Sequence, residues 1–158
     1  MPLPDLTIDT NVFLHSCNNI ELRHGDSLNL VQHLLSCTTN LAIDEGFSLD
    51  SALNKSLIGS EYLNKIVPGS LPSALLTSLA LGGRISMFKT KLTPQLSKKL
   101  NQMVAKPRDR TFIKVSANSV GRTLVSHDFE DFSPAKRRDL SDSFGITVLE
   151  AGPCLGML

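Results

Sequence analysis

Three aspartates stand at positions where a carboxylate can take part in chemistry. Asp9 directly follows the apolar run Leu6–Ile8, and Asp128 closely follows the run Thr123–Val125. Asp109 stands at the start of a helical pattern that precedes the second run. In an open parallel sheet, ligands bind outside the carboxyl ends of the strands, so these acids would meet at one edge. Carboxylates held together repel one another, and a hard cation relieves that repulsion, so we predict a Mg²⁺ or Mn²⁺ site at Asp9, Asp109 and Asp128.

Polar side chains near these acids are candidates for a supporting role. Asn11 can hydrogen-bond a neighbouring carboxylate, or it can cap the helix that begins after Asp9. Ser126 can contact a metal, a water or a phosphate, and Asp131 can act as a further ligand. Both residues also have ordinary alternatives, because Ser126 can cap a turn and Asp131 can be a solvated residue beyond the motif.

Taken together, these motifs resemble those of the PIN-domain family of metal-dependent nucleases. The segment Asp9-Thr10-Asn11 matches the family's early Asp-x-Asn, and Ser126-His127-Asp128 matches its late Ser/Thr-x-Asp, with one extra residue before Asp131-Phe132. Arg108-Asp109 matches the acid that opens the preceding helix. The resemblance extends from about Leu6 to Leu149. It implies an α/β fold, a three-layer α/β/α sandwich with a mostly parallel central sheet, and Mg²⁺- or Mn²⁺-dependent hydrolysis of phosphodiester bonds in RNA.

The family's second acid has more than one candidate in this chain. The family places this acid near the start of the helix after the second strand, often as Glu-Tyr. After the expected strand Leu41–Ile43, the candidates are Glu45 and Asp50, and we favour Asp50, in the first turn of a helix capped by Ser48. Glu61-Tyr62 has the dipeptide but lies farther along the chain. The expected catalytic acids are therefore Asp9, Asp50, Asp109 and Asp128.

Charge is distributed unevenly along the chain. Residues 1–83 hold three Lys/Arg and eight Asp/Glu, a net charge of −5, whereas residues 84–158 hold thirteen and seven, a net charge of +6. An acidic centre rimmed by basic residues suits a metal ion and then a polyanion, although such charges often form only a solvated face. The chain has no Trp and one Tyr, which disfavours binding of single strands by stacking. The basic residues that flank the acids are the candidates for phosphate contacts: Lys106, Arg108, Arg110, Lys136, Arg137 and Arg138.

Length and composition indicate one globular domain over residues 1–158, of which 41% are hydrophobic and 20% charged. Cys17, Cys37 and Cys154 lack C-x-x-C spacing, so neither a disulfide framework nor a zinc site is indicated, and a reducing cytoplasm is the expected compartment. The longest apolar stretch, Leu71–Leu81, is interrupted by polar residues and is too short to span a bilayer. We therefore expect no membrane partner.

Alternating strand and helix patterns fill the rest of the chain. A short apolar run predicts a strand at Ile146–Leu149, and Ile85–Phe88 reads either as a minor strand or as an extended connector. Capping residues and apolar periodicity predict helices capped by or starting at Ser27, Ser48, Pro72, Pro94, Asp109 and Pro134.

Two other functions compete with a nuclease. A haloacid-dehalogenase-like phosphatase also opens with an acid after the first strand, but its first motif needs a second Asp where this chain has Asn11. A PIN-like domain without catalysis could bind RNA or a protein partner, and the weak match at the second acid keeps this alternative open.

The resemblance also has implications for partners. Small bacterial proteins of the family are often toxins of toxin–antitoxin pairs, and many form dimers. It therefore implies an RNA substrate, an antitoxin protein and a homodimer for this chain. The four histidines, His15, His24, His33 and His127, are scattered through the sequence, and we expect them to be structural.

Overall fold

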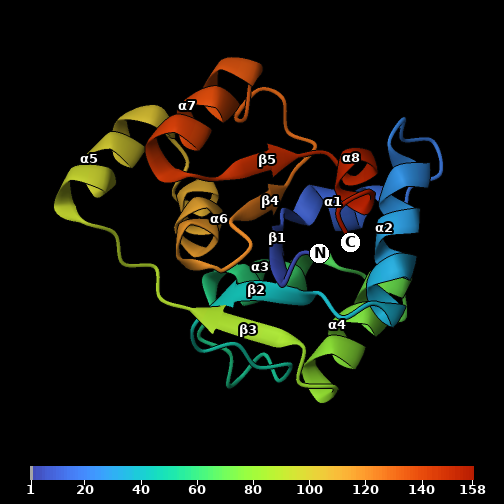
Figure 1. Ribbon diagram of the computed structural model, residues 1–158. Coiled ribbons are helices and arrows are strands. Elements are labelled where there is room, and N and C mark those ends of the chain that lie inside the picture. Colours follow the sequence, from blue (N-terminus) through green and yellow to red (C-terminus); the bar gives the residue numbers. More distant parts are fainter. Residues whose placement is uncertain (1) are drawn as a thin grey trace.

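A central parallel sheet organises residues 2–158, the part of the chain that the computed structural model describes (Figure 1). Its strands pair in the order β3-β2-β1-β4-β5, and every pairing is parallel. The result confirms the predicted α/β fold with a parallel sheet, and Ile85–Phe88 is a strand rather than a connector. The strands are β1 Asp5–Ile8, β2 Asn40–Asp44, β3 Ile85–Phe88, β4 Thr123–Val125 and β5 Thr147–Leu149.

Helices cover both faces of this sheet, which confirms the predicted three layers. The described helices are α1 Thr10–His15, α2 His24–Ser36, α3 Leu57–Lys65, α4 Leu71–Leu81, α5 Pro94–Met103, α6 Pro107–Asn118, α7 Pro134–Phe144 and α8 Ala151–Leu155. In Figure 1, α2, α4 and α8 lie on one side and α5, α6 and α7 lie on the other. Contacts agree with this view, because α2 packs against α4 and α8, whereas α6 packs against β1, β2 and β4.

The strand order reverses next to β1. The chain first adds β2 and β3 on one side of β1, and it then returns to add β4 and β5 on the other side. Such a reversal opens a crevice at the carboxyl ends of the two strands on either side of it. Ile8 pairs with Val125 in the register of β1 and β4, so Asp9 and Ser126 both emerge at this crevice.

The core strands are buried on both faces, as expected for a parallel sheet. Leu6, Ile8 and Leu124 have no exposed surface and belong to one continuous hydrophobic core. Asp5 is also buried, and its carboxylate accepts hydrogen bonds from the backbone N–H groups of Val120 and Gly121. A Cβ atom at Gly121 would lie 2.2 Å from the carbonyl oxygen of Asp5, so only glycine allows this approach of β1 to the chain before β4.

The helix after β2 starts later than the sequence predicted. Residues 45–56 form turns and bends, and α3 begins at Leu57. The reason is a stronger cap: the Asp44 carboxylate accepts from the Leu57 and Ile58 N–H groups at 2.7 and 3.0 Å, and Ser56 accepts from the Gly59 N–H. Ser48 therefore does not cap a helix, and Asp50 lies in an exposed loop.

Two other predicted helix starts have different outcomes. The helix predicted after Ser27 begins earlier, at His24, and contains the buried Ser27 in its first turn. Here Asp26 lies in the first turn, where a negative charge is favoured by the helix dipole. The helix predicted at Pro134 does start there, as α7, and the Ser133 side chain caps it by accepting from the Lys136 N–H.

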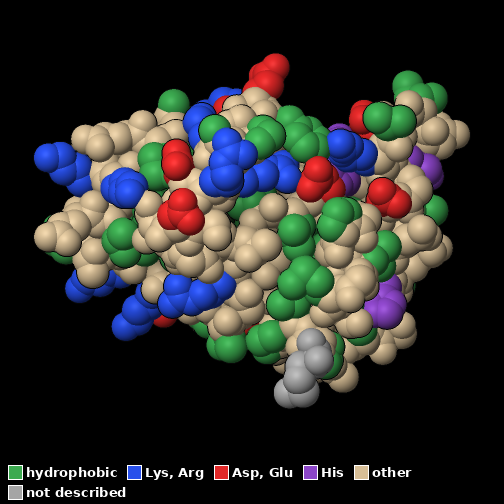
Figure 2. All heavy atoms as spheres, turned by 45° about the horizontal axis from the view of Figure 1, so that its top comes forward, with side chains coloured by type: hydrophobic (Ala, Val, Ile, Leu, Met, Phe, Trp, Pro, Cys, Tyr) green, Lys and Arg blue, Asp and Glu red, His purple; other side chains and the backbone are tan. Residues whose placement is uncertain are grey.

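The charge asymmetry of the chain becomes an asymmetry of the surface. Figure 2 shows Lys and Arg side chains gathering on the side of the molecule that carries α5, α6 and α7, with fewer on the side of α2. All three of these basic helices come from the second half of the chain, whose net charge is +6. Among these three helices, only the starts of α6 and α7 bring basic residues to the carboxyl ends of the strands, where Lys106 pairs with Asp131 and Arg137 pairs with Glu150.

We expect Asp44→Ala to lower the free energy of unfolding by about 2 kcal/mol, because it leaves two N–H groups of α3 without their acceptor. Urea denaturation measures this change. The matched control is Asp50→Ala in the same connection, where the exposed carboxylate accepts only from the Ala52 N–H, and a change within about 0.5 kcal/mol is expected. Equal stabilities for the two variants would refute the capping role of Asp44.

Candidate active site at the carboxyl edge of the sheet

Asp9 occupies the predicted strand-end position and is buried there. It follows β1 at the N-cap of α1, and only 5% of its surface is exposed. The hydroxyl of Ser126, at the end of β4, donates to Asp9 Oδ2 at 2.8 Å. Burial raises the pKa of Asp9, and the hydrogen bond from Ser126 offsets part of that rise. The ends of the two neighbouring strands thus place Asp9 and Ser126 in contact, in keeping with the register of β1 and β4.

Asn11 ties the two strand ends together through the backbone. Its side-chain oxygen accepts from the His127 N–H at 3.2 Å, so it fixes the chain after β4 against α1. The sequence offered two roles for Asn11, orientation of a carboxylate and capping of a helix. The structure gives it a third, which positions Ser126 beside Asp9.

Asp109 is the most deeply buried of the site acids, with 1% of its surface exposed. It lies in the first turn of α6, and within the described residues its Oδ2 has no hydrogen-bond partner. Burial is the main cause that raises the pKa of Asp109 to about 7, followed by the negative charges of Asp131 and Asp9 and by a hydrogen bond shared with Asp131. These three carboxyl groups therefore interact at one edge, and Asp109 titrates near neutral pH.

Asp131 and Asp128 lie in the loop after β4, where Asp131 pairs with a lysine and Asp128 accepts hydrogen bonds from the backbone. Lys106 Nζ contacts Asp131 Oδ2 at 2.6 Å, and this hydrogen bond holds the pKa of Asp131 below its usual value. Asp128 Oδ1 accepts from the N–H groups of Glu130 and Asp131 at 3.0 and 2.8 Å. Asp128 thus shapes the turn that brings Asp131 to the site.

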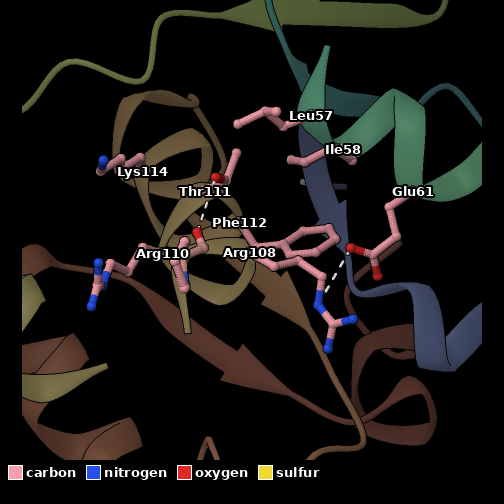
Figure 3. Close-up of a pocket in the computed structure, with 9 residues that line it drawn as sticks. Leu57, Ile58, Glu61, Arg108, Arg110, Thr111, Phe112 and Lys114 are labelled. Atoms are coloured by element: carbon pink, nitrogen blue, oxygen red, sulfur yellow. Dashed lines mark hydrogen bonds and ion pairs between the residues drawn. The ribbon is translucent and has the colours of Figure 1, made fainter. Parts of the chain in front are cut away.

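Glu61 is the acid that the sequence reasoning did not select. Its side chain is only 9% exposed, and its carboxylate faces Arg108, whose Nε lies 3.3 Å from Glu61 Oε2 (Figure 3). The same Nε lies 3.9 Å from Asp109 Oδ1. The negative charge of Glu61 also raises the pKa of Asp9. The next residue, Tyr62, is fully buried and donates its hydroxyl to the carbonyl oxygen of Ile8, which fastens α3 to β1.

Asp50 and Glu45 do not join these acids. Both are exposed in the connection between β2 and α3, and the carboxylate of Asp50 accepts from the Ala52 N–H within the loop. Because α3 starts only at Leu57, the acid that faces the crevice from this helix is Glu61. The Glu61-Tyr62 dipeptide was the signal that could have identified it.

His127 is held as a neutral, structural side chain. Its Nε2 accepts from the Ala151 N–H at 3.1 Å, and its Nδ1 lies 2.9 Å from Nδ1 of His15. Burial, followed by the charge of His15, lowers the pKa of His127 to about 4. Both ring nitrogens are occupied, so His127 has no free atom with which to act as a general base.

The predicted phosphate-binding residues are divided among different surroundings. Arg108 and Lys106 neutralise site acids, whereas Arg110 donates to the carbonyl oxygens of Val104 and Ala105. Arg137 is paired with Glu150 at 2.9 Å and lies over the ring of Phe129, so much of its hydrogen-bonding capacity is used within the protein. Lys136 is half-buried, and Arg138 is exposed on α7.

The site acids stand near one another without forming a ready coordination shell. Within residues 2–158, no group of three or more His, Cys, Asp or Glu side chains is arranged so that it could hold a metal ion. Their partners are instead the side chains of Arg108, Lys106 and Ser126. The described part of the chain also contains no helix long and apolar enough to cross a membrane.

Comparison of the chain with protein-family models, with curated proteins and with solved structures gave no match.

We expect Asp109→Asn to raise the melting temperature at pH 8 and to change it little at pH 5. A carboxyl group whose pKa rises on folding holds its proton more tightly in the folded state, so its contribution to stability is lost as pH rises toward 7. Above that pH the variant avoids a buried charge, and the gain should amount to several degrees, at roughly 2–4 °C per kcal/mol for a domain of this size. Thermal denaturation at the two pH values measures it.

The control for this comparison is Asp139→Asn, which removes an exposed carboxylate on α7. It should leave the melting temperature unchanged at both pH values. A fall in the melting temperature of Asp109→Asn at pH 8 would contradict the carboxyl repulsion inferred for the site.

Proposed function

We propose that the protein is a metal-dependent ribonuclease of the PIN-like type. The proposal rests on one observation: Asp9, Glu61 and Asp109 come from three separate elements and converge, mostly buried, where the strand order reverses. Proteins rarely bury carboxylates together without a task for them. Lys106 and Arg108, at the start of α6, lie at the same acids and suit a polyanionic substrate.

The donor set fits Mg²⁺ or Mn²⁺ in its chemistry. All of the candidate ligands are carboxylate oxygens, which these hard cations prefer, and Asp109 Oδ2 is a buried oxygen without a hydrogen-bond partner in the described chain. We propose that Asp9, Asp109 and Asp128 hold the metal, with Glu61 replacing Asp50 as the second acid of the family pattern and Asp131 in support. A bound ion of this kind supplies activation of water and stabilisation of the leaving oxygen.

The protein's own side chains prepare and balance this site. Ser126 directs the Asp9 carboxylate, and Tyr62 holds α3 in place so that Glu61 faces the crevice. Arg108 and Lys106 now neutralise Glu61 and Asp131. If a bound cation neutralised these carboxylates instead, Arg108 and Lys106 would be available to bind the phosphates of the substrate.

Substrate, partners and compartment follow from the proposed activity and from the resemblance. RNA is the proposed substrate, and an antitoxin protein and a second copy of the chain are the proposed partners. Cys17, Cys37 and Cys154 are all free thiols, which is compatible with the proposed reducing cytoplasm.

A second candidate function is RNA or protein binding without catalysis. The observation that favours it is the pairing of site acids with Arg108 and Lys106, together with the absence of a ready three-ligand group within residues 2–158. In this alternative the acids and bases form a permanent ion-pair network. Metal-dependent cleavage by the purified protein separates the two functions.

We expect Asp9→Asn, Glu61→Gln and Asp109→Asn each to lower the rate of Mg²⁺- or Mn²⁺-dependent cleavage of single-stranded RNA. Each change removes a ligand charge at nearly constant volume, so the loss should exceed the roughly 10–100-fold that changes around metal ligands cost. The matched control is Asp50→Asn, an acid of the same connection outside the site, which should keep the parental rate. Cleavage is followed on a labelled oligonucleotide, with EDTA as the metal-free reference.

If Glu61→Gln cleaved RNA at the parental rate and Asp50→Asn lost activity, the second catalytic acid would be Asp50, as the sequence alone favoured, and not Glu61. Absence of cleavage by the parental protein with either metal would support the binding function instead.

A further inference from the structure

A pocket of about 460 Å³ lies directly beside the acids, between α3 and α6 (Figure 3). Leu57 and Ile58 form its wall on α3, and Pro107, Thr111 and Phe112 form its wall on α6. Ile58 and Phe112 are otherwise buried in the core, whereas Leu57 is 66% exposed at the mouth. The pocket is thus an apolar slot with firm walls and one exposed apolar edge.

The two ends of this slot carry different charges. At one end, Glu61 and Arg108 belong both to the pocket and to the acid site. At the other end lie Arg110 and Lys114, which stand four residues apart on α6 and therefore project from one side of the helix. Figure 3 shows these two side chains pointing away from the Glu61–Arg108 pair.

Lys114 and Arg110 keep cationic hydrogen-bonding capacity toward the solvent. Lys114 takes part in none of the ion pairs found within the described residues. Arg110 donates through Nε and Nη2 to backbone carbonyl groups, so its positive charge has no acidic partner in the same set. An occupant of the slot would therefore meet uncompensated positive charge at the far end.

We infer that this pocket is a nucleotide subsite, which takes the base of a single-stranded RNA next to the phosphate at the acid site and holds the adjacent phosphate with Arg110 and Lys114. A nucleotide has this order of chemistry: an apolar, flat base between two anionic groups. The slot offers the same order, with an apolar centre between a site for a phosphodiester and a pair of cations.

Enclosure, rather than aromatic stacking, would hold the base. The chain has no Trp, and the ring of Phe112 is almost wholly buried, so no exposed aromatic platform is formed at the pocket. Instead, the base would pack between Leu57 and the side of α6. The Thr111 hydroxyl donates to the carbonyl oxygen of Pro107 at 3.2 Å, and its lone pair can still accept from a base amino group.

This inference deepens the proposed ribonuclease function and rests on it for the identity of the substrate. Its test is a binding measurement without added metal, so that it does not depend on catalysis. The probe is adenosine 5′-monophosphate, followed through the NMR signals of the Leu57 and Ile58 methyl groups. Ribose 5-phosphate, which has the phosphate and lacks the base, is the matched probe.

We expect adenosine 5′-monophosphate to shift both methyl signals, and ribose 5-phosphate to bind roughly ten-fold more weakly, because it lacks the group that fills the slot. Lys114→Glu should weaken binding of the nucleotide roughly ten-fold, as expected for one lost charge-assisted contact. The charge-matched control is Lys98→Glu on α5, an exposed lysine outside the pocket, which should bind as the parental protein does.

Leu57→Ala tests the apolar wall with little risk to folding, because Leu57 is exposed. This variant should bind the nucleotide more weakly and should keep the parental affinity for ribose 5-phosphate. Leu53→Ala is its control, since Leu53 is 67% exposed in the neighbouring loop and does not line the pocket. Equal affinities for the two probes, or no shift at either methyl group, would overturn the inference.

The outcomes also separate this inference from the proposed function. RNA cleavage without base-dependent binding would leave the ribonuclease in place and refute the pocket assignment. Base-dependent binding without metal-dependent cleavage by the parental protein would keep the nucleotide subsite and refute the ribonuclease.

Discussion

Burial of carboxylates where two parallel strands end is the constraint on which the rest of this site depends. Asp9 and Asp109 are 5% and 1% exposed, and desolvation raises the pKa of both. A charged carboxylate in such a place needs hydrogen bonds or a neighbouring cation. The chain supplies Ser126 to Asp9, Arg108 to Glu61 and Lys106 to Asp131. The charges of the site are therefore balanced by one hydrogen bond and by two cationic side chains of the protein itself.

The fold brings these groups together because of its strand order. β1 lies beside β4 at the reversal, so residues more than a hundred positions apart face one another across a single pair of strands. α3 and α6 then contribute Glu61 and Asp109 from above the strand ends, and the two helices contact each other. The buried Tyr62, bonded to the last carbonyl of β1, couples the position of α3 to that of Asp9. A displacement of α3 would therefore alter both the acid site and the adjoining pocket.

Local patterns in the sequence were sufficient to predict those site residues that lie at the ends of strands. Asp9 and Ser126 could be predicted because each directly follows a short apolar strand, and the partner of each is set by sheet register. Glu61 could not be selected in the same way. Its place depends on where α3 begins, and that depends on a cap in which Asp44 reaches across to Leu57 and Ile58.

Other features arise only from contacts between distant segments. The pairing of His127 with His15 and that of Lys106 with Asp131 join residues 112 and 25 positions apart, and neither leaves a mark in the local sequence. The layers of the fold were predictable because strands and helices alternate along the chain. Which charges meet at the carboxyl edge is decided by loop lengths and by side-chain packing, which residue spacing alone does not specify.

Titration of the metal-free protein with Mn²⁺, followed by electron paramagnetic resonance of the free ion, tests the central claim most directly. We expect the parental protein to remove Mn²⁺ from solution and Mg²⁺ to compete for the same site. Binding should be lost in Asp109→Asn and retained in Asp50→Asn. Absence of binding by the parental protein, or unchanged binding by Asp109→Asn, would contradict the assignment of these buried carboxylates to a metal site.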